Sequence, residues 1–392
     1  MSHPLIARSD DLQRLVNDGY EVEIIDTHLV IRNVPYVNAE RQIRRGVLII
    51  ALNINVDVTI APNTHVVMFA GEYPCNEDCT PIARLRHGTP HTKVTESLVA
   101  SHSFSNKPPQ GYANYYDLMT AYLAIITGPA EAIDSNATAR TWQVIESDNP
   151  ESVFVYHDTA SSRAGIGEVT RKLEVGPIAI VGVGGSGAYV LDLVAKTPVS
   201  AIHLFDGDRL GQHNAFRAPG AASAAELKAA PYKVDYFANV YSKMRRFIVP
   251  HQTYLTAENV VLLDGMSFVF LCMDAGDAKK AVVEYLEKID LPFIDVGMGI
   301  QMIDGALRGI LRVSTSTPGR RDHIRENKRI SFQGDGNNIY EQNIQIADLN
   351  AMNAALAVMK WKKLLAFYSD LEDEYFCAYT IDGNTIVNED KP

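Results

Sequence analysis

The chain has 392 residues, of which 46% are hydrophobic and 21% are charged, and its formal net charge is −11 at pH 7. This length favours two domains, and this composition excludes a largely disordered chain. The acidic balance argues against nucleic acid as a ligand, because contacts to phosphates need a basic face.

The first residues, MSHPLIARSDDLQRL, lack the basic and then apolar pattern of a secretion signal, and no later segment is apolar for the roughly 18 residues that a membrane span requires. We therefore expect a cytoplasmic protein that makes no membrane contact. The four cysteines, Cys75, Cys79, Cys272 and Cys377, are too few and too scattered for a disulfide scaffold, so we expect them to be reduced.

The first part of the chain has the pattern of a β-rich α+β domain. From Tyr20 to about Ser103, period-two alternation and short apolar runs predict an antiparallel sheet. Apolar residues at three- and four-residue spacings predict a helix over Tyr112 to Ile126. The Pro, Ser, Asn and Asp clusters of residues 128–167 surround two expected short strands and suggest a domain boundary near residue 160. Residues 1–160 are thus predicted to form an N-terminal domain that recognises a partner.

A set of cysteines and histidines in this domain resembles a zinc site. Cys75, Cys79, His87 and His91 have the spacing C-x3-C-x7-H-x3-H. The central gap is shorter than in zinc fingers. The simpler interpretation is therefore that these side chains are ordinary parts of a recognition or regulatory domain.

After Gly167, strands alternate with helical patterns, which indicates a doubly wound, mainly parallel sheet with crossover helices. The predicted strands are Ile178–Val181, Ala201–Phe205, Arg246–Pro250, Phe268–Met273, Phe293–Val296 and a pair around Gly305–Ser314. The predicted helices are Ala188–Lys196, Lys228–Ser242 and Asp277–Lys288. Residues 161–392 are therefore expected to form a second domain with a Rossmann-like α/β fold.

The C-terminal part of this domain begins with a loop, Ser314 to about Asn338, that is rich in Ser, Thr, Gly and Arg. A long helical pattern follows from Ile344 to Phe367, with apolar residues on both faces that indicate deep burial or a subunit interface. Residues 372–392 are mainly acidic or polar, and we expect them to be peripheral.

The most specific stretch follows the first strand of the second domain. The apolar run Ile178–Val181 leads into Gly182, Gly184, Gly185 and Gly187 and then into a helix. A turn that directs backbone N–H groups and a helix N-terminus at a phosphate leaves no room for Cβ atoms. This pattern predicts a nucleotide-binding turn, and the alternative is a glycine turn with a purely structural role.

A run of polar residues follows this turn at the same edge of the predicted sheet. Asp206 closes the next strand about 20 residues on, where a carboxylate holds ribose hydroxyls. The sequence DGDRLGQHNAFR then adds Asp208, Asn214 and Arg217 on a loop. A triphosphate needs cations and polar groups of this kind, whereas a dehydrogenase has little use for them.

Two further charged residues belong to the same pattern. Lys233 lies on the following helix, and Asp274 ends the apolar strand FVFLCM. A carboxylate in that place must be solvated in a cleft or bound to a cation. Simpler interpretations stay open for others: Asp206 as a strand terminator, Arg217 in a surface ion pair, and Lys233 as a solvated helix residue.

Taken in order, GxGGxG, DxD, NxxR, a helical Lys and an Asp at the end of a later strand closely resemble the ThiF-type adenylyltransferases, the relatives of ubiquitin-activating enzymes. The resemblance extends roughly from Gly167 to Phe367. It implies adenylation, with ATP and Mg²⁺, of the C-terminal carboxylate of a ubiquitin-like protein, and release of pyrophosphate.

The resemblance also implies roles for individual residues. In this chain they fall on Gly182, Gly184, Gly185, Gly187 and Asp208 around the nucleotide, Asp206 at the ribose hydroxyls, Arg217 and Lys233 at the phosphates, Asn214 near the α-phosphate and Asp274 at Mg²⁺. A homodimer and a partner similar to ubiquitin-conjugating enzymes are further expectations. An extra N-terminal domain ahead of such a module is similar to proteins of bacterial ubiquitin-like conjugation operons.

This chain departs from the family in one respect. Members that form a thioester carry a Cys in the loop that crosses over the nucleotide site, whereas the corresponding loop here offers only Ser314, Thr315, Ser316, Thr317, Arg320, Arg321 and His323. The protein could stop at the adenylate, pass the acyl group to a distant Cys such as Cys377 or Cys75, or pass it to a loop hydroxyl. We favour the first, because a hydroxyl without an adjacent base is a poor nucleophile.

Other functions remain as alternatives. Within the same fold, the adenylated group could belong to a small peptide or a modified nucleoside. An NAD(P)-dependent oxidoreductase would share the glycine turn but would not need Arg217 and Lys233. A binding module gated by nucleotide would need the site but no chemistry.

Overall fold

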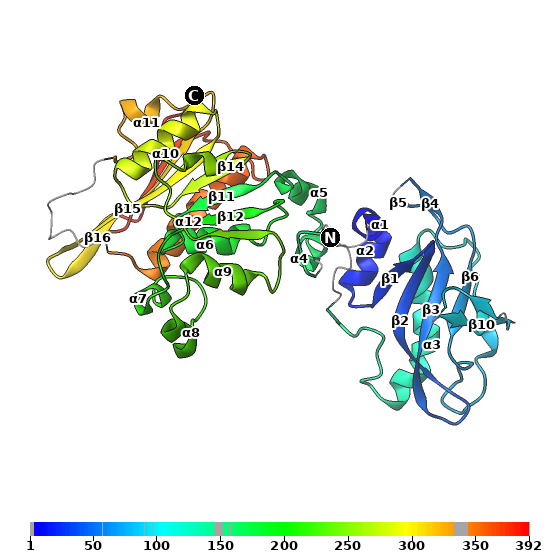
Figure 1. Ribbon diagram of the computed structural model, residues 1–392. Helices are drawn as coiled ribbons and strands as arrows, with labels where there is room; N and C mark the ends of the chain where they lie inside the picture. The colour runs from blue at the N-terminus through cyan, green and yellow to red at the C-terminus, as the bar shows by residue number, and fades with distance from the viewer. Residues whose placement is uncertain are drawn as a thin grey trace. The chain divides into compact units, whose positions relative to one another are not determined.

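The structure is a computed structural model, and it describes residues 4–56, 58–89, 91–96, 98–144, 152–156, 158–332 and 344–391. The chain divides into two compact units (Figure 1). The first comprises Met1–Ser152 and Tyr156–Gly167, and the second comprises Val153–Val155 and Glu168–Pro392. Each unit has a hydrophobic core of its own.

The first unit is built on a six-stranded sheet with the strand order β1-β2-β3-β6-β10-β7, and each neighbouring pair is antiparallel. Its strands are β1 (Val22–Ile25), β2 (His28–Val37), β3 (Ile43–Ala51), β6 (Val66–Ala70), β7 (Arg86–Gly88) and β10 (His102–Ser105). Two short ribbons pair β4 (Ile54–Asn55) with β5 (Val58–Thr59) and β8 (Thr92–Lys93) with β9 (Val99–Ala100). The predicted antiparallel sheet is confirmed.

Helices complete the core of the first unit. The long helix α3 (Tyr115–Ile133) contacts β2 and α2 (Asp10–Asn17), which follows α1 (Pro4–Arg8). A short 3-10 helix, η1 (Ala83–Leu85), precedes β7. Asn114 caps α3, because its side chain accepts a hydrogen bond from the Asp117 backbone N–H. None of the described helices is both long and apolar enough to cross a membrane.

Three features of this unit differ from the prediction. Helix α3 continues past Ile126 through Pro129 to Ile133. Helices α1 and α2 precede the sheet and were not predicted, because each is too short to show a clear helical periodicity of apolar residues. The two short strands expected within residues 128–167 are absent from the described part of that range, which instead holds α4 (Thr159–Arg163) and the start of α5 (Gly167–Thr170).

The second unit contains an eight-stranded sheet with the order β13-β12-β11-β14-β15-β16-β17-β18. The pairs from β13 to β15 are parallel, and those from β15 to β18 are antiparallel. Its strands are β11 (Ile178–Val181), β12 (Ile202–Phe205), β13 (Ile248–His251), β14 (Phe268–Leu271), β15 (Phe293–Ile303), β16 (Ala306–Ser316), β17 (Phe376–Thr380) and β18 (Thr385–Glu389). Its helices are α6 (Ser186–Val194), α7 (Gln212–Ala215), α8 (Ala224–Ala229), α9 (Lys233–Tyr241), α10 (Asp277–Lys288), α11 (His323–Glu326) and α12 (Ala347–Leu364), with the 3-10 helices η2 (Arg171–Leu173) and η3 (Val260–Leu263).

Strand β11 is covered by helices on both faces of the sheet (Figure 1). Ile178 and Ile180 lie in a core with residues of α6, α9 and α12, whereas Ala179 and Val181 lie in a second core with residues of α10. A strand buried on both faces reads as a continuous apolar run, which is why its bounds could be predicted. The predicted fold class, a doubly wound, mainly parallel sheet preceded by a β-rich α+β domain, is confirmed.

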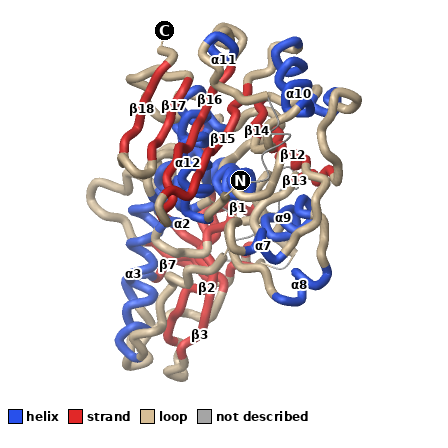
Figure 2. Tube along the Cα trace, turned by 90° about the vertical axis from the view of Figure 1, so that its left-hand side faces the viewer, coloured by secondary structure: helices blue, strands red, loops and turns tan. Residues whose placement is uncertain are grey.

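Residues 372–392 were expected to be peripheral, but part of this segment belongs to the main sheet. Strands β17 and β18 extend the main sheet beyond β16, and Figure 2 shows β18, β17, β16 and β15 side by side in this order. Phe376, Cys377 and Ala378 are buried, whereas nearly all of β18 is exposed. An edge strand with two solvated faces has no apolar alternation, so its sequence resembles a loop.

Three further elements differ clearly from their predicted bounds. Strand β15 continues past its predicted end at Val296 to Ile303. The expected strand pair around Gly305–Ser314 is one long strand, β16, which pairs with β15 along its entire length. The expected helix Lys228–Ser242 is divided into α8 and α9 by Ala230, which has φ +45°, and by Pro231. Proline cannot continue a helix, because it lacks a backbone N–H and clashes with the preceding turn.

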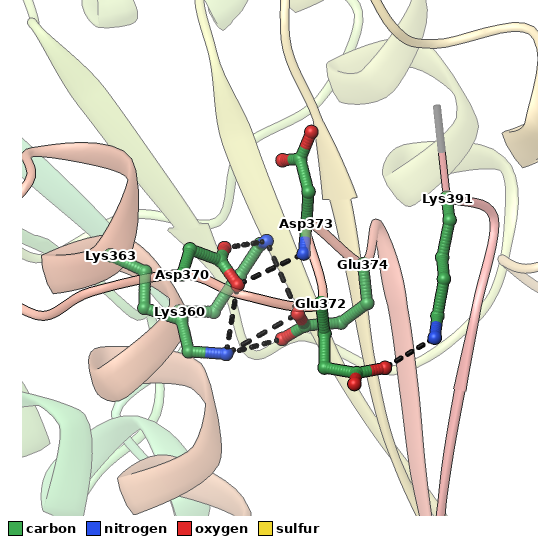
Figure 3. A network of polar contacts seen from close by, with 7 residues as sticks. All are labelled: Lys360, Lys363, Asp370, Glu372, Asp373, Glu374 and Lys391. Carbon is green, nitrogen blue, oxygen red and sulfur yellow. Dashed lines mark hydrogen bonds and ion pairs between the residues drawn. The ribbon is translucent and has the colours of Figure 1, made fainter.

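A network of ion pairs joins the end of α12 to the segment that leads into β17 (Figure 3). Lys360 Nζ lies 2.8 Å from Asp370 Oδ2, and Lys363 Nζ lies 3.1 Å from Glu374 Oε1 and 3.2 Å from Asp370 Oδ1. Lys360 and Glu374 are buried, so each charge depends on its partners for solvation.

We expect this network to make stability depend on pH in acid. Burial alone would raise the pKa of Asp370, but hydrogen bonds from Lys360 and Lys363 outweigh it and lower that pKa to about 2. The stabilisation is therefore fully present above the unfolded pKa of about 4 and is lost as the pH falls from about 4 to about 2, a loss of about 2–3 kcal/mol. Urea unfolding at pH 6 and pH 3 should show Asp370→Asn destabilised at pH 6 and closer to wild type at pH 3. Asp382→Asn, an exposed change in the β17–β18 turn, should track wild type at both.

Candidate functional site

The glycine turn joins β11 to α6 at the carboxyl end of the strand. Gly182 has φ +85°, and a Cβ there would lie 2.7 Å from the Cys272 carbonyl oxygen. A Cβ on Gly187 would overlap the Gly182 carbonyl oxygen, whereas one on Gly184 would meet no atom within 4 Å. Backbone atoms thus leave no room for a side chain at Gly182 or Gly187, whereas no described residue excludes one at Gly184.

This contrast predicts opposite outcomes for two alanine substitutions. Gly187→Ala should lower the urea midpoint of unfolding strongly, because the clash is with backbone, and overpacking of this kind costs about 1–3 kcal/mol or more. Gly184→Ala should unfold as wild type. If Gly184 lies under a phosphate, its Cβ should still weaken ATP binding in calorimetry. Equal stability of the two variants would contradict this account of the turn.

Asp206 connects the end of β12 to the glycine turn. Its buried carboxylate accepts hydrogen bonds from the Val183 backbone N–H (2.9 Å) and from the Asp208 backbone N–H (2.8 Å). Each carboxylate oxygen can accept more than one hydrogen bond, so both can still receive a hydroxyl. Asp206 therefore lies against the turn with acceptor capacity left for a ligand.

Lys233, the first residue of α9, is brought to the same place. Its backbone N–H donates to the Asp208 carbonyl oxygen (2.9 Å), and its Nζ lies 2.5 Å from Asp208 Oδ2 and 3.7 Å from Asp206 Oδ1. The side chain of Lys233 is buried, whereas that of Asp208 is 51% exposed. Hydrogen bonds from Lys233 and then from Tyr254 hold the pKa of Asp208 below its usual value. One buried cation thus lies between two carboxylates.

Asn214 and Arg217 lie on and just after the short helix α7. Asn214 Oδ1 accepts from the Gly211 backbone N–H (2.8 Å), and the Arg217 backbone N–H donates to the Asn214 carbonyl oxygen. In the part of the chain that the structure describes, Asn214 Nδ2 and Arg217 Nε are buried donors without an acceptor. Buried donors are normally paired, so these two fit an oxygen-rich anionic ligand.

Asp274 follows β14 in the chain, close beyond Cys272, and it is exposed. Among the described residues, no group of three or more His, Cys, Asp or Glu is arranged to hold a metal ion. Mg²⁺ is commonly bound through one or two protein carboxylates together with substrate phosphates. A single carboxylate at this edge is compatible with that kind of binding.

No sequence pattern pointed to Asn350, which ties these parts together. This buried residue of α12 accepts a hydrogen bond from Ser186 Oγ (3.0 Å) and donates to the Arg217 carbonyl oxygen (3.0 Å). A Cβ on Gly185 would collide with its amide group. Asn350 and Asn353 are buried polar residues within the apolar part of α12, and asparagine disfavours helix interiors. That local mismatch was the available signal.

A second feature that no sequence pattern indicated is a buried ion pair beside the glycine turn. Lys279 Nζ of α10 lies 2.5 Å from Asp295 Oδ1 of β15 and also donates to the Met273 carbonyl oxygen (3.2 Å). Both side chains are 6% exposed. The pair therefore holds the strand end that carries Asp274.

The loop expected to cross over the nucleotide site begins at the sheet edge opposite to the glycine turn. Ser314, Thr315 and Ser316 are buried residues of β16. Beyond them, Arg321 donates to the Glu287 carbonyl oxygen (2.6 Å) near the end of α10. A crossover helix ends at the amino edge of parallel strands, so Thr317, Arg320, Arg321 and His323 lie at the edge opposite to the glycine turn. These described hydroxyls are not placed to receive a group from that turn. Residues 333–338 of the expected loop lie outside the described residues.

The cysteines offer few nucleophiles. Burial raises the pKa of the Cys75, Cys272 and Cys377 thiols, which disfavours the reactive thiolate, whereas Cys79 is half-buried. The set Cys75, Cys79, His87 and His91, whose spacing resembles a zinc site, is not gathered around a common point in the described residues. His87 Nδ1 lies 2.9 Å from Ser103 Oγ, and Cys75 Sγ donates to the Tyr73 carbonyl oxygen.

Comparisons with known protein families divide the chain in two. A sequence model of the ThiF family matches residues 160–383, more than half of the 392 residues. A model described as a domain of unknown function, DUF6791, matches residues 10–159. The first match agrees with the doubly wound fold of the second unit.

Individual relatives are distant. Ubiquitin-like modifier-activating enzyme 5 of Culex quinquefasciatus is 24% identical over 186 residues, which are 44% of this chain and 45% of that enzyme. The chain therefore spans less than half of that relative. The crystal structure of E. coli MccB aligns with a TM-score of 0.45 and 17% identity over 56% of this chain and 64% of MccB. That of PaaA aligns with a TM-score of 0.45 and 13% identity over 57% of this chain and 75% of PaaA.

Proposed function

The chain belongs to the ThiF family, and we propose that its second unit adenylates the C-terminal carboxylate of a ubiquitin-like protein with ATP and Mg²⁺. In this reaction a carboxylate oxygen attacks the α-phosphorus of ATP. The bond from that phosphorus to the bridging oxygen of the β-phosphate breaks, and pyrophosphate leaves. A carboxylate is a ready nucleophile, so the site mainly orients the reactants and neutralises charge on the phosphates.

The observation that carries this proposal is the pair of buried donors without acceptors. Asn214 Nδ2 and Arg217 Nε lie in a loop that Asn350 ties to the glycine turn. A nucleotide whose ribose hydroxyls bond Asp206 would bring its phosphates toward the turn and these donors. Lys233 would supply the buried positive charge.

Mg²⁺ fits the same arrangement. Asp274 would hold it together with phosphate oxygens, and the ion would offset charge on the leaving pyrophosphate. Lys279 would act indirectly, because it fixes the Met273 carbonyl oxygen and so the position of the next residue.

The acyl group is proposed to leave the site as an adenylate. Cys75 and Cys377 are buried thiols with raised pKa values, and the described loop hydroxyls lie at the opposite sheet edge. A nucleophile of a partner similar to ubiquitin-conjugating enzymes would then attack the acyl carbon of the adenylate, the acyl–phosphate bond would break, and AMP would leave. We further propose a homodimer, a partner-recognition role for the first unit, and a place in a bacterial ubiquitin-like conjugation system.

ATP–pyrophosphate exchange tests the proposal. We expect exchange that requires Mg²⁺ and a ubiquitin-like protein with a free C-terminal carboxylate, and none with the same protein amidated at its C-terminus. Exchange supported instead by a short peptide or a modified nucleoside would redefine the substrate. Calorimetric binding of NAD(P) but not ATP would favour an oxidoreductase, and ATP binding without exchange would favour a gated binding module.

Intact-mass spectrometry after the same incubation locates the product. We expect the mass of an adenylated ubiquitin-like protein and the mass of this chain without modification. A ubiquitin-like protein joined to Cys75, Cys79 or Cys377 through a bond that hydroxylamine cleaves would contradict the proposal that this chain stops at the adenylate.

A further inference from the structure

We propose that Tyr254 is a positioning residue of the adenylation site, which fixes Asp208 and through it the ammonium group of Lys233. This inference rests on the proposed function. Tyr254 follows β13, the strand next to β12, and no sequence pattern singled it out. Its hydroxyl donates a hydrogen bond to Asp208 Oδ1, while Lys233 Nζ contacts Oδ2.

Asp208 needs a second contact besides Lys233, because about half of its side chain is exposed to solvent. The side chain of Asp208 is 51% exposed, so packing restrains its rotamer only in part. With one oxygen on Tyr254 and the other on Lys233, both carboxylate oxygens are engaged, and the plane of the group is set. The hydrogen bond to Asp208 raises the pKa of Tyr254 to about 12, so the hydroxyl stays protonated and donates throughout the neutral range.

The ring of Tyr254 is also held in place. It lies on Gly207, between Asp206 and Asp208, so closely that a Cβ there would come 2.5 Å from Cε2. Asn259 Nδ2 donates to the Tyr254 carbonyl oxygen (2.9 Å) and thereby braces its loop. Tyr254 is nevertheless 59% exposed, so burial of its ring in a core does not explain its position.

The same geometry provides two independent ways to remove the contact. Tyr254→Phe deletes the hydroxyl and keeps the ring. Gly207→Ala leaves Tyr254 unchanged, but its Cβ would push the ring and its hydroxyl away from Asp208. Since Gly207 has no positive φ, alanine is compatible with the backbone there.

We expect both variants to lower the rate of ATP–pyrophosphate exchange at saturating ATP about fivefold, the effect of losing a partly solvated hydrogen bond to a charged group. The urea midpoint should not change. In an Asp208→Ala background, Tyr254→Phe should have no further effect, because the contact acts through Asp208. Tyr285→Phe, which removes a similar hydrogen bond to Asp264 away from the site, should exchange as wild type.

Wild-type exchange by Tyr254→Phe would overturn the inference, as would an unchanged effect of that substitution in the Asp208→Ala background. If the wild-type protein shows no exchange, the proposed function fails separately. Calorimetric titration with ATP then tests Tyr254 alone: Tyr254→Phe should bind ATP more weakly than Tyr285→Phe, and equal affinities, or no binding at all, would overturn it.

Discussion

Replacing Lys233 with methionine is expected to lower the rate of ATP–pyrophosphate exchange about 100- to 1,000-fold, the range observed when one preorganised electrostatic donor is removed. Methionine keeps most of the buried stem and removes only the charge. Lys233 lies between Asp206 and Asp208, so its loss leaves uncompensated negative charge at the place where the proposed mechanism puts the phosphates. The rate at saturating ATP should therefore fall together with ATP affinity.

A matched control separates this effect from a general change in charge. Lys228→Met, an exposed change on the preceding helix α8, removes the same charge and should exchange as wild type. Circular dichroism and urea unfolding should show that Lys233→Met still folds. An exchange rate within threefold of wild type in a folded Lys233→Met protein would remove Lys233 from the proposed mechanism.

The parts of the site that could be predicted from sequence depend on local chemistry. The bounds of β11 and α10 agree with their predictions because a buried strand and an amphipathic helix have strong periodicities. The glycine turn and Asp206 lie within 30 residues of each other, and the chain alone places both at the carboxyl edge of the sheet.

The parts that could not be predicted are set by tertiary contacts. Tyr254 lies 46 residues from Asp208 in sequence, and Asn350 lies 133 residues from Arg217. A lone tyrosine in a loop or a lone asparagine in a helix has no pattern that assigns it a partner. Thr317 and His323 were expected near the nucleotide site but lie at the opposite sheet edge. Strand β16 runs antiparallel to β15, so the chain leaves it at the amino edge of the parallel strands, and the composition of the loop does not reveal that direction.

The break between α8 and α9 shows a different limit. Pro231 was present in the sequence, yet an apolar periodicity over Lys228–Ser242 outweighed it. The break has a consequence for the site, because it makes Lys233 the first residue of α9, where its backbone N–H is free to bond the Asp208 carbonyl oxygen. A continuous helix would have used that N–H internally and would have separated Lys233 from the turn.

Breaking the buried pair of Lys279 and Asp295 is expected to have the largest effect on stability. Removing either partner leaves an uncompensated buried charge, which costs about 3–5 kcal/mol, a large part of the 5–15 kcal/mol that is typical of a whole protein. Lys279→Ala and Asp295→Ala should each lower the free energy of unfolding of the second unit by this amount. Unfolding can be followed in a Trp142→Phe background, in which the fully buried Trp361 of that unit is the remaining tryptophan.

The double variant Lys279→Met/Asp295→Leu distinguishes a charge effect from a packing effect. Replacing both ions by apolar groups removes the desolvation cost together with the attraction, so the double variant should recover most of the stability that each single variant loses. Lys280→Ala, an exposed change on the next residue of α10, should remain within about 0.5 kcal/mol of wild type. The recovered protein should still exchange pyrophosphate slowly, since Lys279 also holds the Met273 carbonyl oxygen beside Asp274. Additive losses in the double variant would instead mean that the two side chains stabilise the unit separately, through packing.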